Sequence, residues 1–389
     1  MTSTRKIDRS ATENICPAYR DGNGVWHVRD YVSGRAVLRN TDTVQAGLGV
    51  ETVEKLPAGF RRPVLYWDGP EHREYRRQTA RFFTPKRVDA EYRELMHRIA
   101  DREIAVLRRA GSADLSELSF RLAVDVAKAV IGLTDSRPGT ARRLERFFPE
   151  KLGKPGFTSA SGVYWAARIL YLWLAVYVGD VRPAVRSRVR RRQDDLISHL
   201  LDEGVRTGEI LSECLTVAAA GMVTTREFIS AAAWHLFTDD DLRARYRAGD
   251  EPERLAILHE LARLEPPLAA LRRRTTAPVP LPDGTTIAAG ERVDISVAAA
   301  NIDPAMAGDR PGATCPDRPT NHGAGPAGLT FGDGAHKCPG AHIAIQESDI
   351  FLTKLLALEH VRMTSPPRVS FNEDFASYAL HGLTVSIGQ

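Results

Sequence analysis

The helical periodicity between Pro70 and about Leu271 constrains the fold of this chain more than any other feature of its sequence. Apolar residues recur at i, i+3 and i+4 spacing through this run, and helix-breaking residues are few. A long helical run followed by a short mixed segment predicts a mainly α fold with a minor β part. Breaks between helices are predicted near Gly111 and at 136–139, 154–156, 179–183 and 204–208.

The minor β part is predicted before and after this run. Residues 279–299 alternate in polarity around an Asp-Gly pair, which predicts a β-hairpin. WHVRDY at 26–31 predicts a short strand, and 46–63 predicts a glycine- and proline-punctuated loop with one helical turn. A glycine- and proline-rich loop is predicted from about 303 to 340, followed by a helix at 341–357 and short strands to the end.

The composition excludes several classes of protein. Hydrophobic residues make up 43% of the chain and charged residues 26%, as in a soluble globular protein. The four cysteines are widely spaced without a C-x-x-C pair, which argues against a disulfide framework and a structural zinc site. Cysteine usage and an N-terminus without an apolar signal core favour a cytoplasmic protein. The net charge of +4 is mild, and the basic run at 185–195 is interpreted as a solvated helix face, so no nucleic-acid partner is predicted.

The most apolar stretch lies at 162–178, and Arg168 interrupts it. No run of about 18 apolar residues remains, so neither a membrane span nor a membrane partner is predicted. We interpret this stretch as a largely buried helix. The alternative is an aromatic-lined roof over a pocket.

The segment FGDGAHKCPG raises the question of what Cys338 does in a chain without cysteine cross-links. A helix is predicted directly after it, and backbone N–H groups near a helix start lower the pKa of a thiol. Gly332, Gly334 and Gly340 allow left-handed backbone and the close approach of a large flat ligand. One thiolate without a second protein ligand suits a metal whose other ligands come from a cofactor, haem iron above all.

This segment resembles the haem-binding loop of cytochromes P450, whose pattern is F-G-x-G-x-H/R-x-C-x-G. The matching positions are Phe331, Gly332, Gly334, His336, Cys338 and Gly340. The resemblance implies the P450 fold, a helix-rich triangular prism around haem b, as a single domain over 1–389. It implies that Cys338 is the axial thiolate, that Phe331 packs beside its sulfur and that His336 reaches a haem propionate. Pro339 replaces a more usual aliphatic residue and removes one backbone donor near sulfur.

HELARLEPP resembles the P450 K-helix motif, which lies N-terminal to the cysteine loop. Glu260 and Arg263 are at i and i+3, so they are neighbours on one helix face. The resemblance implies a buried structural ion pair that fixes the cysteine loop. The connection at 300–325 lacks the family's usual phenylalanine–proline spacing, and no residue is assigned there.

DGPEHREYRRQTARFFTP resembles the P450 C-helix. His72 and Arg76 are at i and i+4, so both can meet one anionic haem propionate. In LRRRTT, the resemblance implies that Arg273 is a further propionate partner, with Arg274 as the alternative.

TVAAAGMVTTREF resembles the helix that crosses the distal face of haem in P450s, where the pattern is A/G-G-x-D/E-T-T. Ala220 and Gly221 match, and glycine leaves room for oxygen beside the iron. Thr224 aligns with the alcohol that helps to protonate the distal oxygen. Val223 stands where the family has an acid, although activation of dioxygen requires protons.

Three explanations of Val223 stay open. Water or the substrate relays the proton, another acid such as Glu227 replaces it, or the departure is tolerated. We favour the first, because sites without the acid often act on substrates with their own N–H or O–H groups. Hydrogen abstraction and radical coupling then give C–C or C–N bonds. Residues 221–228 resemble those of actinobacterial P450s that couple tryptophan-containing cyclic dipeptides.

The resemblance also implies a substrate pocket drawn from the loop 45–66, the helices around 157–178, the distal helix and the turn near 378–380. Its aromatic residues suit an aromatic ligand, although ordinary core packing is the commoner role of each. The predicted substrate contacts are Gln45, Tyr66, Ala219, Val223, Leu268, Ala270, Tyr378 and Leu380, with Trp67, Tyr164, Trp165 and Trp173 nearby.

We therefore predict a haem-thiolate oxidoreductase that uses haem b and dioxygen on a small organic substrate of secondary metabolism. Oxidative coupling of aromatic cyclic dipeptides is the favoured reaction, and conventional hydroxylation of another natural product is the alternative. A non-catalytic haem-binding protein is an alternative of another class, and a cysteine-nucleophile hydrolase lacks a placed base. Electrons are expected from NAD(P)H through a ferredoxin reductase and a ferredoxin. The basic side chains predicted to dock the ferredoxin are Arg76, Arg77, Arg81, Lys86, Arg87 and Lys337.

Overall fold

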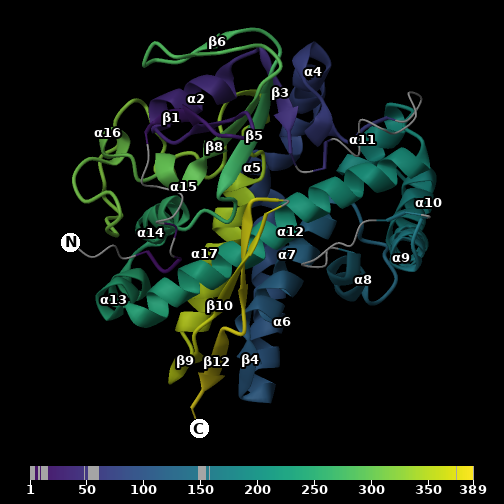
Figure 1. Cartoon of the computed structure of the whole chain (residues 1–389). Helices are drawn as coiled ribbons and strands as arrows, with labels where there is room; N and C mark the ends of the chain where they lie inside the picture. Colours follow the sequence, from purple (N-terminus) through teal and green to yellow (C-terminus); the bar gives the residue numbers. More distant parts are fainter. Residues whose placement is uncertain are drawn as a thin grey trace.

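The computed structural model describes residues 5–7, 9, 16–47, 49–50, 61–147, 155–156, 158–373 and 375–388. Much of the predicted loop 46–63 and part of the predicted break at 154–156 lie outside the described residues. Figure 1 shows a mainly helical body with a small sheet at one edge and short strands at another, which confirms the predicted fold class.

Helices fill most of the run that begins at Pro70. The α-helices are α2 Tyr31–Arg39, α4 Gly69–Thr79, α5 Pro85–Arg87, α6 Arg93–Ala110, α7 Leu115–Ile131, α8 Thr140–Phe147, α9 Ala160–Val176, α10 Arg182–Arg190, α11 Leu196–Asp202, α12 Thr207–Thr238, α13 Asp240–Ala248, α14 Glu251–Leu264, α15 Val297–Ala300, α16 Pro304–Ala307 and α17 Ala341–Leu356. Shorter helical turns are η1 Val64–Tyr66, η2 Ala80–Phe83, η3 Val88–Tyr92, η4 Tyr177–Val181 and η5 Gly334–His336.

The strands are short. They are β1 Ala18–Arg20, β2 Val25–Val28, β3 Thr43–Ala46, β4 Ser112–Asp114, β5 Ala270–Thr275, β6 Val279–Pro280, β7 Thr286–Ile287, β8 Arg292–Ser296, β9 Val361–Ser365, β10 Arg368–Asn372, β11 Ser377–His381 and β12 Thr384–Ile387. The predicted hairpin is confirmed, because β6 and β7 pair in antiparallel fashion. β8 leaves the hairpin and pairs with β5 and β2 instead.

The core lies around α12, the 32-residue helix that runs through the body in Figure 1. Helix α12 packs along α7 and also against α14 and α17, and α17 packs on α6. Apolar side chains from these five helices form one buried cluster. Helix α17 follows Cys338, so this packing fixes the end of the cysteine loop against the central helix.

The five-stranded sheet has the order β1-β2-β8-β5-β3. Its edge strand β3 runs antiparallel to β5, and the register places Gln45 opposite Arg273. Residues that are more than 200 positions apart in the chain therefore become neighbours at one edge of the sheet.

Two boundary predictions were wrong. The strand predicted at 26–31 ends at Val28, because Asp30 accepts a hydrogen bond from the Ser33 N–H at 2.7 Å and caps a helix that begins at Tyr31. The break predicted at 179–183 is a π-helical turn, η4, inside one helix that runs from Ala160 to Arg190.

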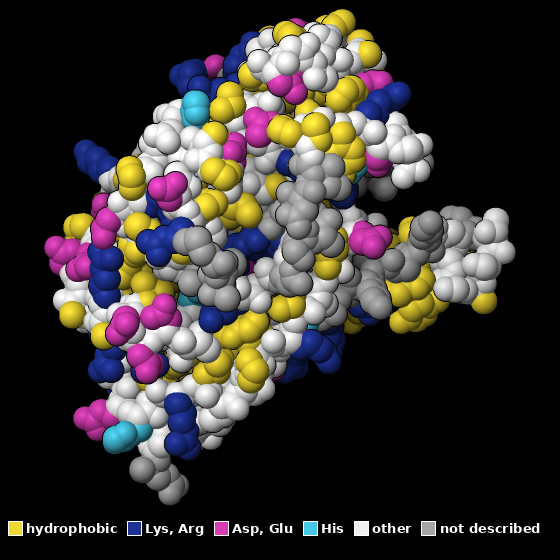
Figure 2. Space-filling model, turned by 60° about the vertical axis from the view of Figure 1, so that its left-hand side comes forward, with side chains coloured by type: hydrophobic (Ala, Val, Ile, Leu, Met, Phe, Trp, Pro, Cys, Tyr) yellow, Lys and Arg dark blue, Asp and Glu magenta, His cyan; other side chains and the backbone are white. Residues whose placement is uncertain are grey.

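The apolar stretch at 162–178 is not a largely buried helix. Only Gly162, Leu172 and Val176 of α9 are buried, and its outer face is exposed. Ala160–Arg190 is the one helix among the described residues that is long and apolar enough to cross a membrane by length and composition, which is weak evidence by itself. Elsewhere, acidic and basic side chains are interspersed over the face shown in Figure 2, as the mild net charge leads one to expect.

Candidate functional site

The cysteine loop is a tight turn that ends where α17 begins. The Cys338 N–H donates to the Phe331 carbonyl at 2.8 Å, which closes the loop on itself. Gly332 and Gly334 have φ values of 66° and 67°, in the left-handed region that favours glycine. A Cβ on Gly334 would lie 2.2 Å from the carbonyl oxygen of Leu38, so no other residue fits there without moving α2.

Opposing effects act on the Cys338 thiol. Burial raises its pKa, while the N–H groups of Gly340 and Ala341 and the charge of Arg76 lower it. The side chain nevertheless remains accessible. Cys338 is therefore accessible, and the backbone donors at the start of α17 favour its thiolate.

Helix α12 is accessible at its middle, although most of it is buried. Ala220 and Gly221 are exposed, and a Cβ on Gly221 would meet nothing within 4 Å. The Thr224 Oγ1 donates to the Ala220 carbonyl at 2.6 Å. This stretch therefore offers open space beside a hydroxyl group that the helix itself holds in place.

A polar cluster joins β3, β5, α4 and the cysteine loop. The rings of His72 and His336 stack with centroids 4.2 Å apart, and His336 Nε2 lies 2.9 Å from Asp68 Oδ1. Asp68 Oδ2 accepts the Gln45 N–H at 3.0 Å. Arg273 Nη1 donates to Gln45 Oε1 at 2.7 Å. Sequence reasoning missed Asp68, which links the two halves of this cluster.

The cluster suits an anion. His72 Nδ1 is buried without a hydrogen-bond partner among the described residues. Burial and the neighbouring positive charge of His336 lower the pKa of His72 to about 4. Burial also lowers the pKa of Arg273 to about 10. An anionic group bound here would supply the missing partner of His72 and raise both pKa values.

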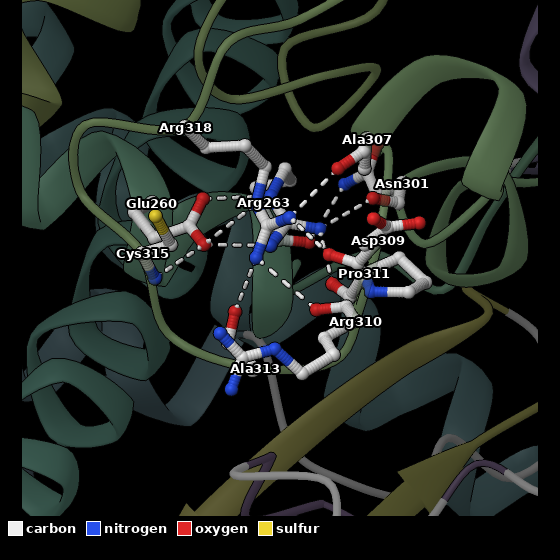
Figure 3. A network of polar contacts seen from close by, with 10 residues as sticks. All are labelled: Glu260, Arg263, Asn301, Ala307, Asp309, Arg310, Pro311, Ala313, Cys315 and Arg318. Atoms are coloured by element: carbon white, nitrogen blue, oxygen red, sulfur yellow. Dashed lines mark hydrogen bonds and ion pairs between the residues drawn. The ribbon is translucent and has the colours of Figure 1, made fainter.

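A buried network of polar contacts locks α14 to the segment before the cysteine loop (Figure 3). Arg263 donates to the two carboxylate oxygens of Glu260 at 2.6 and 2.7 Å, and its Nη1 donates to the carbonyls of Asn301 and Pro311. Glu260 Oε1 also accepts the Cys315 N–H at 2.9 Å and lies 3.3 Å from Arg318 Nε.

Arg318 extends this network, and sequence reasoning assigned no residue in its segment. Its guanidinium also donates to four carbonyls, those of Ala307, Asp309, Arg310 and Ala313. A basic residue at 318 gave no periodic or spacing signal, because most of its partners are backbone carbonyls of the irregular segment after α16.

Comparisons with known proteins agree with this geometry. The family model for cytochrome P450 matches residues 255–376. Cytochrome P450 105C1 of a Streptomyces species is 30% identical over 383 residues, which cover 95% of this chain and 91% of the relative. The chain belongs to the cytochrome P450 family.

Two further comparisons describe this P450. The erythromycin C-12 hydroxylase of Saccharopolyspora erythraea is 28% identical over 358 residues, which cover 88% of this chain and 83% of the relative. The solved structure of a mutant of P450 EryK in complex with erythromycin B is 26% identical with a TM-score of 0.75, and the match covers 96% of this chain and 93% of that one. The protein is a haem-thiolate oxidoreductase. It uses haem and dioxygen, and it receives electrons from redox partners.

The described residues fit haem. Cys338 supplies an accessible thiol with backbone donors, and Gly221 leaves room on α12. The Nδ1 of His72, which is buried without a hydrogen-bond partner among the described residues, and the buried Arg273 provide donors for a propionate. The assignment of these residues, and of Phe331, Gly332, His336 and Gly340 beside them, to haem stays a prediction. Arg76 donates to the Lys337 carbonyl of the cysteine loop, so it reaches the same region from α4.

Five of the eight predicted substrate contacts fall into two groups. Gln45, Leu268 and Ala270 share the wall of a cavity of about 10 Å³, which has room for about one water molecule at most. Tyr378 and Leu380 are buried against Ile7 and Ala231 rather than open to a pocket. Gln45 also accepts a hydrogen bond from Arg273, and its contact with a substrate stays a prediction.

Of the aromatic side chains, Tyr66 is half-buried on η1 and burial raises its pKa. Tyr164 is 60% exposed on the outer face of α9. Its place on that face shows that it does not line the interior. Whether the remaining predicted residues touch a substrate stays a prediction.

The acid that sequence reasoning offered as a replacement at position 223 is engaged elsewhere. Glu227 accepts the Leu380 N–H of β11 at 2.7 Å and pairs with Arg226. Another acid lies beside the threonine pair. Glu347 of α17 is buried, shares a side-chain hydrogen bond with Thr225, and has an Oε2 without a hydrogen-bond partner among the described residues.

Burial raises the pKa of Glu347 from its usual 4.5 to about 8. The folded protein therefore keeps this carboxyl protonated at neutral pH, whereas the unfolded chain ionises it near pH 4.5. Sequence reasoning missed Glu347, because it stands in the polar run QESD of the helix predicted at 341–357, which gives no signal of a buried role.

We expect Glu347→Gln to remove a pH dependence of stability. Between about pH 4.5 and 8 the native state binds this proton and the unfolded state does not, so stability from this group falls by about 1.4 kcal/mol per pH unit as the pH rises. Urea unfolding at several pH values should show that the free energy of unfolding of Glu347→Gln rises relative to that of the wild type as the pH increases across this window. Ser348→Ala, at a buried neighbour without a titrating group, is the control. Equal pH profiles for the wild type and Glu347→Gln would contradict the assignment.

Proposed function

We propose that this P450 hydroxylates a natural-product substrate of secondary metabolism. The observation that carries the proposal is the open stretch of α12, where the Thr224 hydroxyl is held on the Ala220 carbonyl near Gly221, at which an added Cβ would meet nothing within 4 Å. The named relatives support it, because one of them is the erythromycin C-12 hydroxylase. They offer no support for the coupling of cyclic dipeptides, so conventional hydroxylation is preferred.

When bound, haem supplies the activation of dioxygen, and the chain supplies its surroundings. Cys338 would hold the iron, and the backbone donors at the start of α17 would favour the thiolate against the effect of burial, which raises the pKa of the thiol. His72, His336 and Arg273 would hold the propionates. Gly221 leaves space for oxygen, and Thr224 presents a hydroxyl group there. The acid–alcohol pair usual in the family is incomplete at Val223.

We propose that Glu347 donates the proton that the acid missing at position 223 would otherwise deliver. Its carboxyl is protonated at neutral pH, and its partner Thr225 is adjacent in the chain to Thr224. A group with a pKa near the working pH is well suited to give up and regain a proton. Ordered water between the two threonines and the reacting oxygen would complete the route.

Glu347→Gln tests this route. We expect it to lower product formation by roughly 10- to 100-fold, because one general acid contributes on that scale or above. Electrons from the redox partners should then form hydrogen peroxide instead of product. Val223→Asp in the same background should restore coupling, because it returns an acid to the usual position. A solvent isotope effect and the infrared carbonyl band of the protonated acid give readouts apart from turnover. Unchanged coupling in Glu347→Gln would show that the proton comes from water or substrate.

Products made from ¹⁸O₂ test the reaction class. The screen compares macrolides, terpenes and fatty acids with cyclic dipeptides that carry indole or phenol groups. Spectral binding first selects ligands, and mass spectrometry then examines their products. A product with one ¹⁸O atom supports hydroxylation. A dimer without ¹⁸O, formed only from cyclic dipeptides, overturns hydroxylation in favour of coupling.

The proposed partner is a small acidic ferredoxin, served by a reductase that draws on NAD(P)H. Lys337 of the cysteine loop is exposed and supports docking on the thiolate side. Part of the predicted basic face is already neutralised, because Arg77 pairs with Glu74 and Arg87 pairs with Asp194. A cytoplasmic location fits such a partner.

A further inference from the structure

Exposed apolar side chains are concentrated on one helix of this P450. Seven large hydrophobic side chains are exposed among the described residues, and five of them lie on α9 with exposures between 47% and 63%. They are Val163, Tyr164, Leu170, Tyr171 and Leu174. Their spacing places them on one side of the helix, opposite the buried Gly162, Leu172 and Val176. We call these five residues the apolar stripe.

A row of arginines continues the same helix. Arg182, Arg186 and Arg190 are exposed on α10 at i, i+4 and i+8. Within the part of the chain that the structure describes, no hydrogen bond or ion pair engages their side chains. Many other arginines do have an acidic partner, such as Arg192 with Asp202. We call these three residues the arginine row.

The π-helical turn η4 brings the two groups onto one face. A π turn carries one extra residue, so it rotates everything after it by about 100° relative to a continuous α-helix. Without it, Arg186 would lie about 160° around the helix from Leu170; with it, the angle is about 60°, within the apolar stripe. The helix Ala160–Arg190 thus presents an apolar half and a cationic half to the same side.

The turn is held in place by buried contacts. Asp180 of η4 is fully buried and pairs with Arg143 of α8 at 2.8 Å, and it accepts from Thr140 Oγ1 at 2.7 Å. A Cβ on Gly179 would lie 2.6 Å from Arg143 Nε, so glycine allows this close packing. These buried contacts therefore hold the apolar stripe and the arginine row on the same face of the helix.

We propose that the outer face of Ala160–Arg190 docks on an anionic lipid surface. An apolar stripe with tyrosine and leucine, continued by arginines, matches a bilayer interface in both polarity and charge. A second copy of the chain is a poorer match, because Asp180, the one acid within Ala160–Arg190, is buried and the helix offers the arginine row no exposed acidic counterpart. The helix lies on the surface and does not span it, since its other side packs against the protein.

Vesicle co-sedimentation of the haem-loaded full chain tests this proposal. The probes are vesicles of phosphatidylcholine alone and vesicles of phosphatidylcholine with phosphatidylglycerol. The wild type should bind the anionic vesicles at low ionic strength and lose this binding at high salt. Leu170→Gln/Leu174→Gln and, separately, Arg186→Glu/Arg190→Glu should each weaken partitioning by roughly tenfold or more.

Matched controls lie outside the face. Phe371→Gln removes the exposed aromatic of β10, and Arg98→Glu reverses an exposed charge on α6. Both should bind vesicles like the wild type. The proposal is overturned if the wild type does not bind anionic vesicles, or if the two stripe substitutions leave binding unchanged. It is also overturned if the wild type avoids vesicles but forms a dimer, or binds an acidic polypeptide, in a way that Leu170→Gln/Leu174→Gln abolishes.

Discussion

Glu260→Ala is expected to yield a protein that unfolds readily and retains little haem. The substitution removes the carboxylate that accepts hydrogen bonds from Arg263, and Arg263 is fully buried. Removing one partner of a buried ion pair lowers the free energy of unfolding by about 3 to 5 kcal/mol, which is a large part of the stability of a typical domain. The loss is increased because the Cys315 N–H also loses its acceptor and Arg318 loses its anion.

Urea unfolding and haem content after purification measure this effect. Glu253→Ala is the matched control, because Glu253 is another glutamate of α14 that pairs with an arginine at the surface. Surface pairs of this kind contribute about 0 to 1 kcal/mol. If the two variants had the same unfolding midpoint and haem content, the network in Figure 3 would not be what holds the cysteine loop.

Cys338→Ser is expected to remove the spectroscopic signature of the family while leaving the fold in place. The serine hydroxyl replaces the thiol with a smaller group that is not a thiolate, so the red-shifted Soret band of the reduced carbon monoxide complex should disappear. Turnover should fall by several orders of magnitude, because haem would lose the thiolate ligand that supports its oxygen chemistry. Absorption spectra and single-turnover assays measure the two effects.

Cys315→Ser is the control for this experiment. Cys315 contributes its backbone N–H to Glu260, and that donor survives the substitution. Stability, spectrum and activity should therefore match the wild type. A Cys338→Ser protein that kept the red-shifted band would refute thiolate ligation by Cys338.

Much of the fold could be predicted from the sequence, because it depends on residues that are close together in the chain. Apolar spacing predicted the helical run, the Asp-Gly pair predicted the β6–β7 hairpin, and the glycines around Cys338 predicted a tight loop before a helix. The capping of α2 by Asp30 is also local, but the apolar strand pattern before it hid the boundary.

The chemistry of the site depended on contacts that no local pattern contains. Glu227 and Glu347 are both acids near Thr224 in the fold, yet only the packing of β11 and α17 shows that the first is occupied and the second lies beside Thr225. Asp68 and Arg318 likewise acquire roles only through partners that are distant in the chain.

By itself, the sequence determined the family, the thiolate loop and the order of helices and strands, because each rests on residues close together in the chain. The tertiary structure alone decided which side of Ala160–Arg190 faces outward, how Arg273 meets Gln45, and which carboxyl stays protonated. Burial and long-range pairing set those outcomes. Both depend on the whole fold, because the desolvation of a group is determined by every element packed around it.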